Sequence, residues 1–162
     1  MALRPDRTHK GSYIDFFMNE VAERGGIVSV STVGSGAAMD QAEQLCTYAA
    51  NMSGVKPLGV LMGDMVNLDL TRQHENWHKE EVQLGGKVTI WHDCTVVTDM
   101  IDPGVTITAG DTAYVGPSGL FANAIPATQS SETGTLADKY IVGRFVSTKD
   151  EDGFCKISVN LP

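Results

Sequence analysis

The chain has 162 residues, 42% of them hydrophobic, which is enough for one domain built around a single core. Twelve Lys and Arg against twenty Asp and Glu leave a net charge of −8, and this argues against sequence-independent binding to DNA or RNA, which depends on cationic side chains. No stretch reaches the roughly 20 apolar residues of a transmembrane helix, and the N-terminus lacks the apolar segment of a signal peptide. We therefore expect a protein that is made in the cytoplasm and is not exported by the usual route.

Residues 1–26 predict an N-terminal arm or short helix in front of the main domain. Four apolar side chains fall near helical spacing: Tyr13, Phe16, Phe17 and Val21. Ser12 is placed to cap such a helix, and the pair Gly25-Gly26 is placed to end it. The segment either packs on the chain's own core or docks on a neighbouring protein. If it docks, deleting residues 1–24 is expected to weaken binding without unfolding the rest of the chain.

Residues 27–162 predict a β domain. Runs of alternating or β-branched apolar residues between Gly-rich turns are expected to form strands at 27–33, 57–62, 65–68, 87–92, 94–98, 112–115, 120–121, 140–147 and 154–161. Turns are expected at Gly63-Asp64 and Asp152-Gly153, and a surface loop at 122–135, whereas residues 40–51 fit either a helix or a strand. Many short strands at even spacing indicate a mainly β fold, a small β-barrel or sandwich, with a charged insertion at 69–84.

The three cysteines, Cys46, Cys94 and Cys155, are far apart, and no Cys-x-x-Cys pair exists. Structural zinc sites usually take their cysteines in close pairs, and an odd number at wide spacing is not typical of a disulfide scaffold. We expect the three thiols to be reduced and mostly buried as small apolar side chains.

One motif suggests catalysis. The run His74-Glu75-Asn76-Trp77-His78 matches H-E-x-x-H, in which two His one helical turn apart share a zinc ion and the Glu acts as general base. The flanking residues are polar, although such a motif normally lies on a long helix with apolar residues behind the ligands. Position 81 is Glu where the extended zinc-protease pattern has Gly, and position 84 is Leu where it has His. We therefore expect no enzyme activity, no metal ligands and no cofactor, and a zinc-dependent hydrolase remains an alternative.

The C-terminal half contains several short motifs. They are Thr108-Ala109-Gly110-Asp111-Thr112-Ala113-Tyr114-Val115, Gly119-Leu120, Ile141-Val142-Gly143-Arg144-Phe145 and Cys155-Lys156-Ile157-Ser158-Val159-Asn160-Leu161. With Pro57-Leu58-Gly59-Val60-Leu61 before them, they make residues 55–162 resemble the small β-barrel decoration (cement) proteins of tailed-bacteriophage heads. The shared pattern is an Ala-Gly-Asp turn before a strand, then a Gly followed by large apolar residues, then an alternating last strand. The N-terminal segment and the 69–84 insertion lie outside this resemblance.

The resemblance implies a virion protein, made in the host cytoplasm, that binds the capsid exterior and cross-links neighbouring major capsid subunits without catalytic residues. Its partners would be the major capsid protein and itself, as a homotrimer, with no nucleic acid and no membrane. Aromatic and Met side chains commonly anchor protein interfaces. Candidate capsid or self-interface residues are therefore Tyr13, Phe16, Phe17, Met62, Met65 and Trp77. A general ligand-binding β module is a second alternative.

Overall fold

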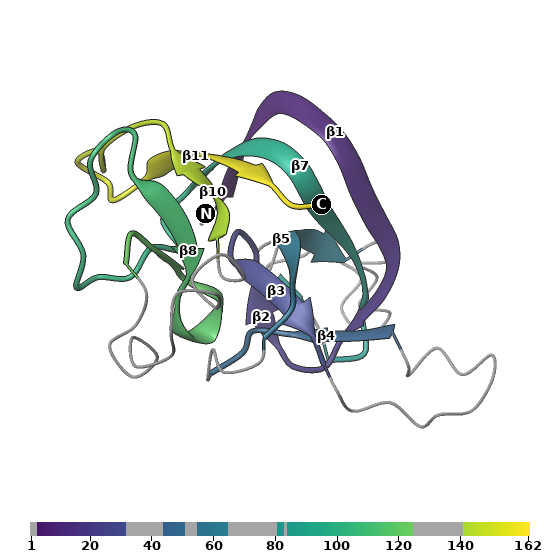
Figure 1. The fold of residues 1–162 in the computed structure, drawn as a ribbon. Coiled ribbons are helices and arrows are strands. Elements are labelled where there is room, and N and C mark those ends of the chain that lie inside the picture. Colours follow the sequence, from purple (N-terminus) through teal and green to yellow (C-terminus); the bar gives the residue numbers. More distant parts are fainter. Residues whose placement is uncertain (1–2, 32–43, 51–54, 65–80, 83, 125–140) are drawn as a thin grey trace.

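The computed structural model describes residues 3–31, 44–50, 55–64, 81–82, 84–124 and 141–162 (Figure 1). In chain order the elements are β1 (Leu3–Met18), β2 (Ala22–Glu23), β3 (Ile27–Val30), β4 (Leu45–Thr47), β5 (Pro57–Asp64), β6 (Glu81–Val82), β7 (Lys87–Thr98), β8 (Thr112–Val115), the 3-10 helix η2 (Pro117–Gly119), β9 (Phe121–Ala122), β10 (Ile141–Phe145) and β11 (Cys155–Asn160). The regular structure of these residues is mainly β, which confirms the fold class expected from the sequence.

Strand β7 organises the sheet because it pairs with three other strands. Along one edge it pairs antiparallel with β1 over almost its whole length, from Leu3↔Thr98 to Phe17↔Lys87. The other edge is shared, since β5 pairs with the first part of β7 and β11 with the second part. Figure 1 shows β1 and β7 as two nested arches, with β11 alongside β7.

Five strands close into a ring. Strand β1 pairs with β4, β4 with β3, β3 with β5 and β5 with β7, and β7 returns to β1. The β1–β4 contact is parallel and short, whereas the other four pairings are antiparallel. Beyond β7, the strands β11, β10, β8 and β9 extend the sheet as antiparallel neighbours. The described chain therefore combines a closed ring and an open sheet that share β7.

Two clusters of buried side chains fill these two halves. The ring cluster comprises Met18, Ala22, Val28, Cys46, Leu61, Val82, Val88 and Ile90. The main cluster comprises Ile27, Val60, Cys94, Val96, Ile101, Ile107, Ala113, Val115, Phe121, Val142, Phe145, Cys155, Ile157, Val159 and Leu161. Strands β3 and β5 contribute to both clusters, because successive side chains of a strand point to opposite faces. These two strands thus form a wall with apolar side chains packed on either side.

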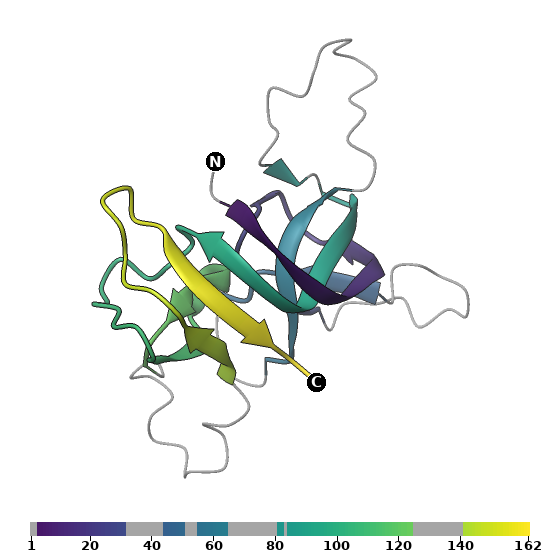
Figure 2. The ribbon, with the colours of Figure 1, turned by 90° about the horizontal axis from the view of Figure 1, so that it is seen from above.

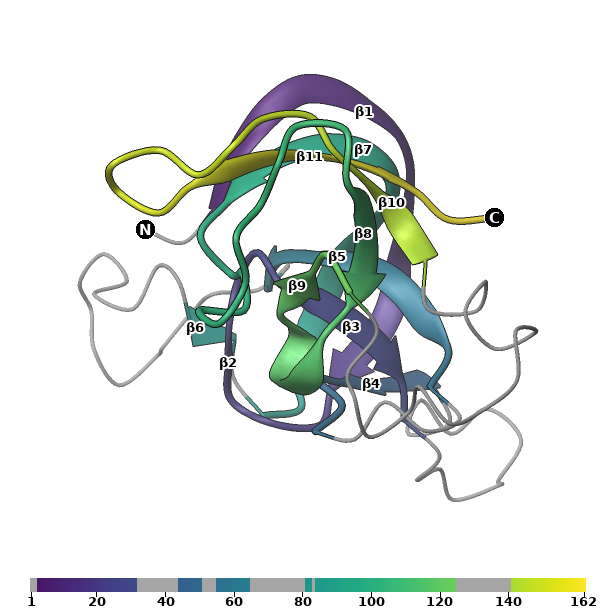
Figure 3. The same cartoon turned by 60° about the vertical axis from the view of Figure 1, so that its left-hand side comes forward.

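Tyr48, which follows β4, connects the ring to the other half. Its hydroxyl donates a hydrogen bond to the carbonyl of Glu23 (2.5 Å) and accepts one from the backbone N–H of Gly26 (3.1 Å). Its own backbone N–H donates to the Glu20 carboxylate (2.6 Å). The ring of Tyr48 packs on Gly119 of η2, which lies in front of β3 in Figure 3. Burial raises the pKa of Tyr48 above its usual range, so the hydroxyl stays protonated.

The helix predicted between Ser12 and Arg24 is wrong, because β1 runs as a strand through Met18. The reason is a β-bulge between Tyr13 and Phe16, where the register with β7 shifts. A bulge adds a residue to one strand and places residues three apart on one face, and the two rings meet edge to face with centroids 5.9 Å apart. The bulge therefore produces the three-residue spacing that also characterises a helix.

Two strand boundaries also differ from the prediction. Residues 87–98 form one strand instead of two, because the alternation of buried residues continues on both sides of His92 and Asp93. Gly63-Asp64 is not a turn but the end of β5, which contains a register shift between Leu61 and Gly63. The ambiguous stretch before residue 51 contains strand β4. Most of the charged insertion, and the strand expected at 65–68, lie outside the described residues.

Candidate docking surfaces

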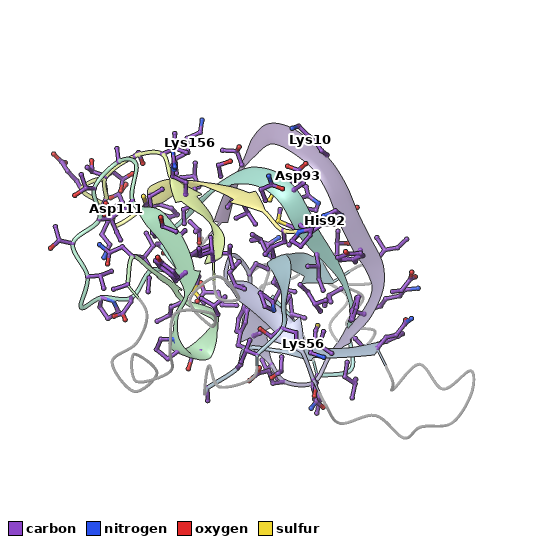
Figure 4. All side chains as sticks on the ribbon, in the orientation of Figure 1. Lys10, Lys56, His92, Asp93, Asp111 and Lys156 are labelled. Carbon is purple, nitrogen blue, oxygen red and sulfur yellow. The ribbon has the colours of Figure 1, made fainter. Side chains whose placement is uncertain are left out.

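The two sides of the β1–β7 ribbon have different chemistry. The even-numbered residues of β7 from Val88 to Thr98 are buried, apart from half-buried His92. The odd-numbered residues face outward, apart from Trp91, which packs against the main cluster. Two of them form ion pairs with β1: Lys10 Nζ lies 4.0 Å from Asp93 Oδ2, and Lys87 Nζ lies 3.9 Å from Asp15 Oδ1. Lys10 and Asp15 therefore both lie on the outer side of the ribbon. Figure 4 shows Lys10 above Asp93 on this side.

An aromatic stack holds the inner side of β1 in place. The Tyr13 ring stacks on the His92 imidazole with centroids 4.6 Å apart, and its edge contacts Phe16. The imidazole covers Gly11, where an added Cβ would come within 2.4 Å of it. A glycine in a strand leaves a gap that a cross-strand aromatic ring can fill. This packing fixes Tyr13 although 36% of its surface remains exposed.

We call residues 10–15 of β1 the edge strip. Its exposed residues are Lys10, Ser12, Tyr13, Ile14 and Asp15. The most exposed apolar side chain among them is Ile14, at 45%. Within the described part of the chain, β1 pairs along its second edge at Phe17 and Met18, with β4. Figure 2, seen from above, shows β1 lying outermost across the molecule. The strip is thus an exposed, partly apolar stretch of strand that is paired along one edge.

A second exposed apolar site lies where the β1–β7 ribbon ends. Val21 is 60% exposed and Leu84 is 65% exposed, the two largest exposed fractions among the large apolar side chains described. They come from adjacent segments, since Gly85 N–H donates to the carbonyl of Met18 (2.7 Å) and Ala22 pairs with Val82. We call Val21 and Leu84 the end patch. Neighbouring exposed apolar side chains are more informative about binding than single ones.

The predicted interface residues are divided among these places. Tyr13 belongs to the edge strip, and half-buried Phe16 packs against the ring cluster. Phe17 is also half-buried, and Met62 packs against the main cluster. Met65 and Trp77 lie outside the described residues, as does the motif at 74–78. Of the four predicted anchors that lie in the described residues, the structure places one, Tyr13, at an exposed position.

Sequence reasoning missed the residues that complete these surfaces. Ile14 and Leu84 were not singled out, and Val21 was placed with Tyr13, Phe16 and Phe17 on the apolar face of a helix that would either pack on the core or dock on a neighbour. The charged residues Lys10 and Asp15 were also missed as a pair. The sequence does contain a signal for the strip. If residues 10–15 are taken as a strand, the apolar pair Tyr13-Ile14 stands between the opposite charges of Lys10 and Asp15.

The Ala-Gly-Asp motif that carries the resemblance forms a tightly bonded turn. The Asp111 carboxylate accepts hydrogen bonds from the backbone N–H of Thr108 (2.9 Å) and from Nδ2 of Asn123 (3.2 Å). The backbone N–H of Gly110 donates to the carbonyl of Phe145 (2.8 Å), and Phe145 N–H donates to the carbonyl of Asp111 (2.9 Å). The motif thus joins the start of β8 to the end of β10, which is a structural role.

The structure confirms the prediction that the three cysteines are buried, unpaired thiols. Burial raises the pKa of Cys46 and of Cys94 to about 12 each, and it also raises the pKa of Cys155. Because the thiolate is the nucleophile and metal ligand, these side chains are unreactive at neutral pH. Among the residues that the structure describes, no group of three or more His, Cys, Asp or Glu side chains is placed to hold a metal ion.

The sequence matches no known protein family, and it matches no curated protein. In the described part of the chain, no helix has the length and hydrophobicity needed to cross a bilayer.

Proposed function

We propose that the chain is a non-enzymatic virion structural protein that binds the outer surface of a tailed-phage capsid and cross-links neighbouring major capsid subunits. The observation that carries this proposal is the presence of two separate apolar surfaces, the edge strip and the end patch, on one small rigid fold. A protein that cross-links must engage at least two neighbours, and an enzyme has no such need. The partner comes from the resemblance of the motifs at 55–162 to phage decoration proteins, which bind the capsid.

Rigidity supports the docking role. Tyr13 is held by the His92 stack, and the ends of β1 and β7 are joined by two backbone hydrogen bonds between Met18 and residues 85 and 86. Side chains that are already fixed lose little conformational entropy on binding, so more of the contact energy appears as affinity. Small surfaces of this kind suit a protein that acts in many copies on a lattice.

Avidity supplies the mechanism. Each surface alone is small, but a subunit held at two points makes the second contact at a high effective concentration. Binding to the assembled shell, and not to free subunits, stabilises the shell by mass action. The resemblance implies that the active form is a homotrimer, which would multiply these contacts further.

Binding to shells tests the proposal. Shells assembled from the major capsid protein encoded with this chain are mixed with the purified protein and sedimented, and the pelleted fraction gives the affinity. We expect saturable binding to shells and none to unassembled subunits. The double variant Val21→Ser, Leu84→Ser is expected to weaken binding on the order of tenfold or more, because apolar anchors dominate interface energies.

The matched control is the double variant Ile141→Ser, Val146→Ser, which removes two exposed apolar side chains from the other half of the molecule. It is expected to bind as the wild type does. A wild-type protein that is folded by circular dichroism but does not pellet with shells contradicts the proposed function. Equal binding by the two double variants would assign the capsid contact to another surface.

A further inference from the structure

The outer edge of β1 is an unusual feature for a stable monomer. From Leu3 to Phe16 the strand pairs along one edge with β7, and within the described residues no second strand pairs with its other edge. A long strand with an open edge offers a row of backbone donors and acceptors to another chain. Natural proteins usually protect such edges with bulges, Pro and charged residues.

Proline protects only the first part of β1, whereas register shifts also occur within the edge strip, at Gly11/Ser12 and between Tyr13 and Phe16. Pro5 and the irregular pairing around it interrupt the first half of the edge. The edge strip that follows contains no proline, and it exposes Tyr13 and Ile14. The charges in the strip stand at its two ends, Lys10 at the beginning and Asp15 at the end. These charges leave the strip open to a partner with the opposite charge order.

A second copy of the same strip has that order when it runs antiparallel. Lys10 and Asp15 lie on the same outer side of the ribbon, because both pair with outward-facing residues of β7. In an antiparallel pair centred on Ser12 or Tyr13, Lys10 of each copy lies next to Asp15 of the other. A parallel pair would instead bring Lys10 to Lys10 and Asp15 to Asp15, which is unfavourable for cross-strand neighbours.

We propose that the edge strip is a self-association site, where β1 of one copy pairs antiparallel with β1 of a second copy around a two-fold axis. Such an interface is isologous, so every contact occurs twice. The pairing extends the sheet across two molecules, satisfies the open backbone groups and covers Ile14 and Tyr13. The pairing does not use the end patch, which lies beyond the strip where the ribbon ends. A pair therefore presents two end patches, one from each copy, and these supply the two capsid contacts that cross-linking requires.

A two-fold pair differs from the homotrimer implied by the family resemblance, and the two assemblies are distinguished by mass. Sedimentation velocity of the full-length protein over a range of concentrations is expected to show a monomer–dimer equilibrium. A protein that remains monomeric at high micromolar concentration, or that forms a trimer, overturns the pairing. Neither outcome affects the capsid-binding test, which depends on the end patch.

Charge reversal identifies the site. Lys10→Glu and Asp15→Lys each place two like-charged neighbours across the two-fold axis and are each expected to raise the dimer dissociation constant on the order of tenfold. The double variant restores opposite charges between the copies and is expected to return the dissociation constant close to the wild-type value. Salt should weaken the wild-type dimer and strengthen the single variants relative to it.

The double variant excludes an explanation within one chain. Inside a monomer residues 10 and 15 pair with Asp93 and Lys87, not with each other. Reversing both charges therefore creates two intramolecular repulsions, and a purely structural effect would make the double variant worse than either single one. Rescue of the dimer supports the proposal, and additive loss overturns it. Thermal unfolding of each variant verifies that the monomer remains folded.

Discussion

The two halves of the molecule are built in different ways. In the half around the main cluster, β8 pairs with β9, the next strand in the chain, and β10 pairs with β11, the next strand after it, through a regular antiparallel register. The ring instead depends on β1, which pairs with strands far along the chain through a register that shifts four times. One half is assembled from close neighbours in sequence, whereas the other is closed by its first strand.

The two halves also differ in how many apolar side chains they bury and how many they expose. The main cluster contains most of the large buried side chains, among them Phe121 and Phe145, both fully buried. Of the seven large apolar side chains that are exposed in the described residues, four lie on the ring side in the edge strip and the end patch. The half with the regular strands acts as the scaffold, and the irregular ring presents the surfaces that are available for contact.

The strongest test of this comparison is removal of β1. Deleting residues 1–24 removes a whole strand of the ring together with fully buried Met18 and buried Ala22. We expect the shortened chain to lose cooperative unfolding in urea, because the ring cluster opens to solvent on one side. A shortened chain that unfolds with the midpoint and slope of the wild type would show instead that the segment is a detachable arm, as the sequence pattern of residues 1–26 also allows.

The predictability of the fold follows the same division. Strands β8 and β11 could be located from alternating apolar residues, because each has one buried face. Strand β10 could be located from its apolar run, although a register shift leaves its buried residues three apart. Strand β1 could not be assigned, because the bulge at Tyr13 and Phe16 imitates helical spacing. Strand β7 was divided at Asp93, although its even-numbered residues are buried throughout the strand, apart from half-buried His92.

The surfaces were harder to predict than the strands. The expected anchors were chosen by residue type, and most large apolar residues are buried in a core of this size. Phe16 and Met62 followed that general rule and pack against the clusters. Val21 and Leu84 became exposed because the ribbon ends there, and the ending of a long-range strand pair cannot be read from local pattern.

A second test compares phenylalanines from the two halves. Phe145→Ala removes a fully buried ring from the main cluster and is expected to cost about 3–5 kcal/mol of unfolding free energy. Phe16→Ala removes a half-buried ring that packs at the margin of the ring cluster and is expected to cost about half as much. Urea unfolding measures both. Equal losses would mean that the ring is packed as completely as the scaffold.

A third test concerns the junction at Tyr48. Gly119 has φ +74° and an added Cβ would lie 2.3 Å from the Tyr48 ring, whereas Gly110 has φ +100° and open space around it. Gly110→Ala is expected to cost about 1 kcal/mol, the backbone penalty alone. Gly119→Ala adds a steric clash and is expected to cost about 1–3 kcal/mol more. Equal thermal shifts for the two variants would show that the junction tolerates movement and that the halves are not tightly coupled.

A fourth test concerns the loss of stability expected at alkaline pH, with one thiol in each half. Cys46 belongs to the ring cluster and Cys94 to the main cluster, and burial raises the pKa of each from 9.0 to about 12. Between these values the unfolded chain loses the thiol proton and the folded chain keeps it, so the stability present below pH 9 falls as pH rises. At pH 10 each thiol is expected to lower the unfolding free energy by about 1.4 kcal/mol relative to pH 8.

Urea midpoints at pH 8 and pH 10 measure this loss, and single Cys→Ala variants assign it. Each substitution has its own packing cost, which is the same at both pH values. The informative quantity is therefore the change in the urea midpoint between pH 8 and pH 10. Cys46→Ala and Cys94→Ala should each remove a similar part of that change if both clusters exclude water equally. If Cys46→Ala leaves the change intact while Cys94→Ala reduces it, the ring opens enough for its thiol to ionise. That result would place the flexibility of the molecule in the half that presents the edge strip and the end patch.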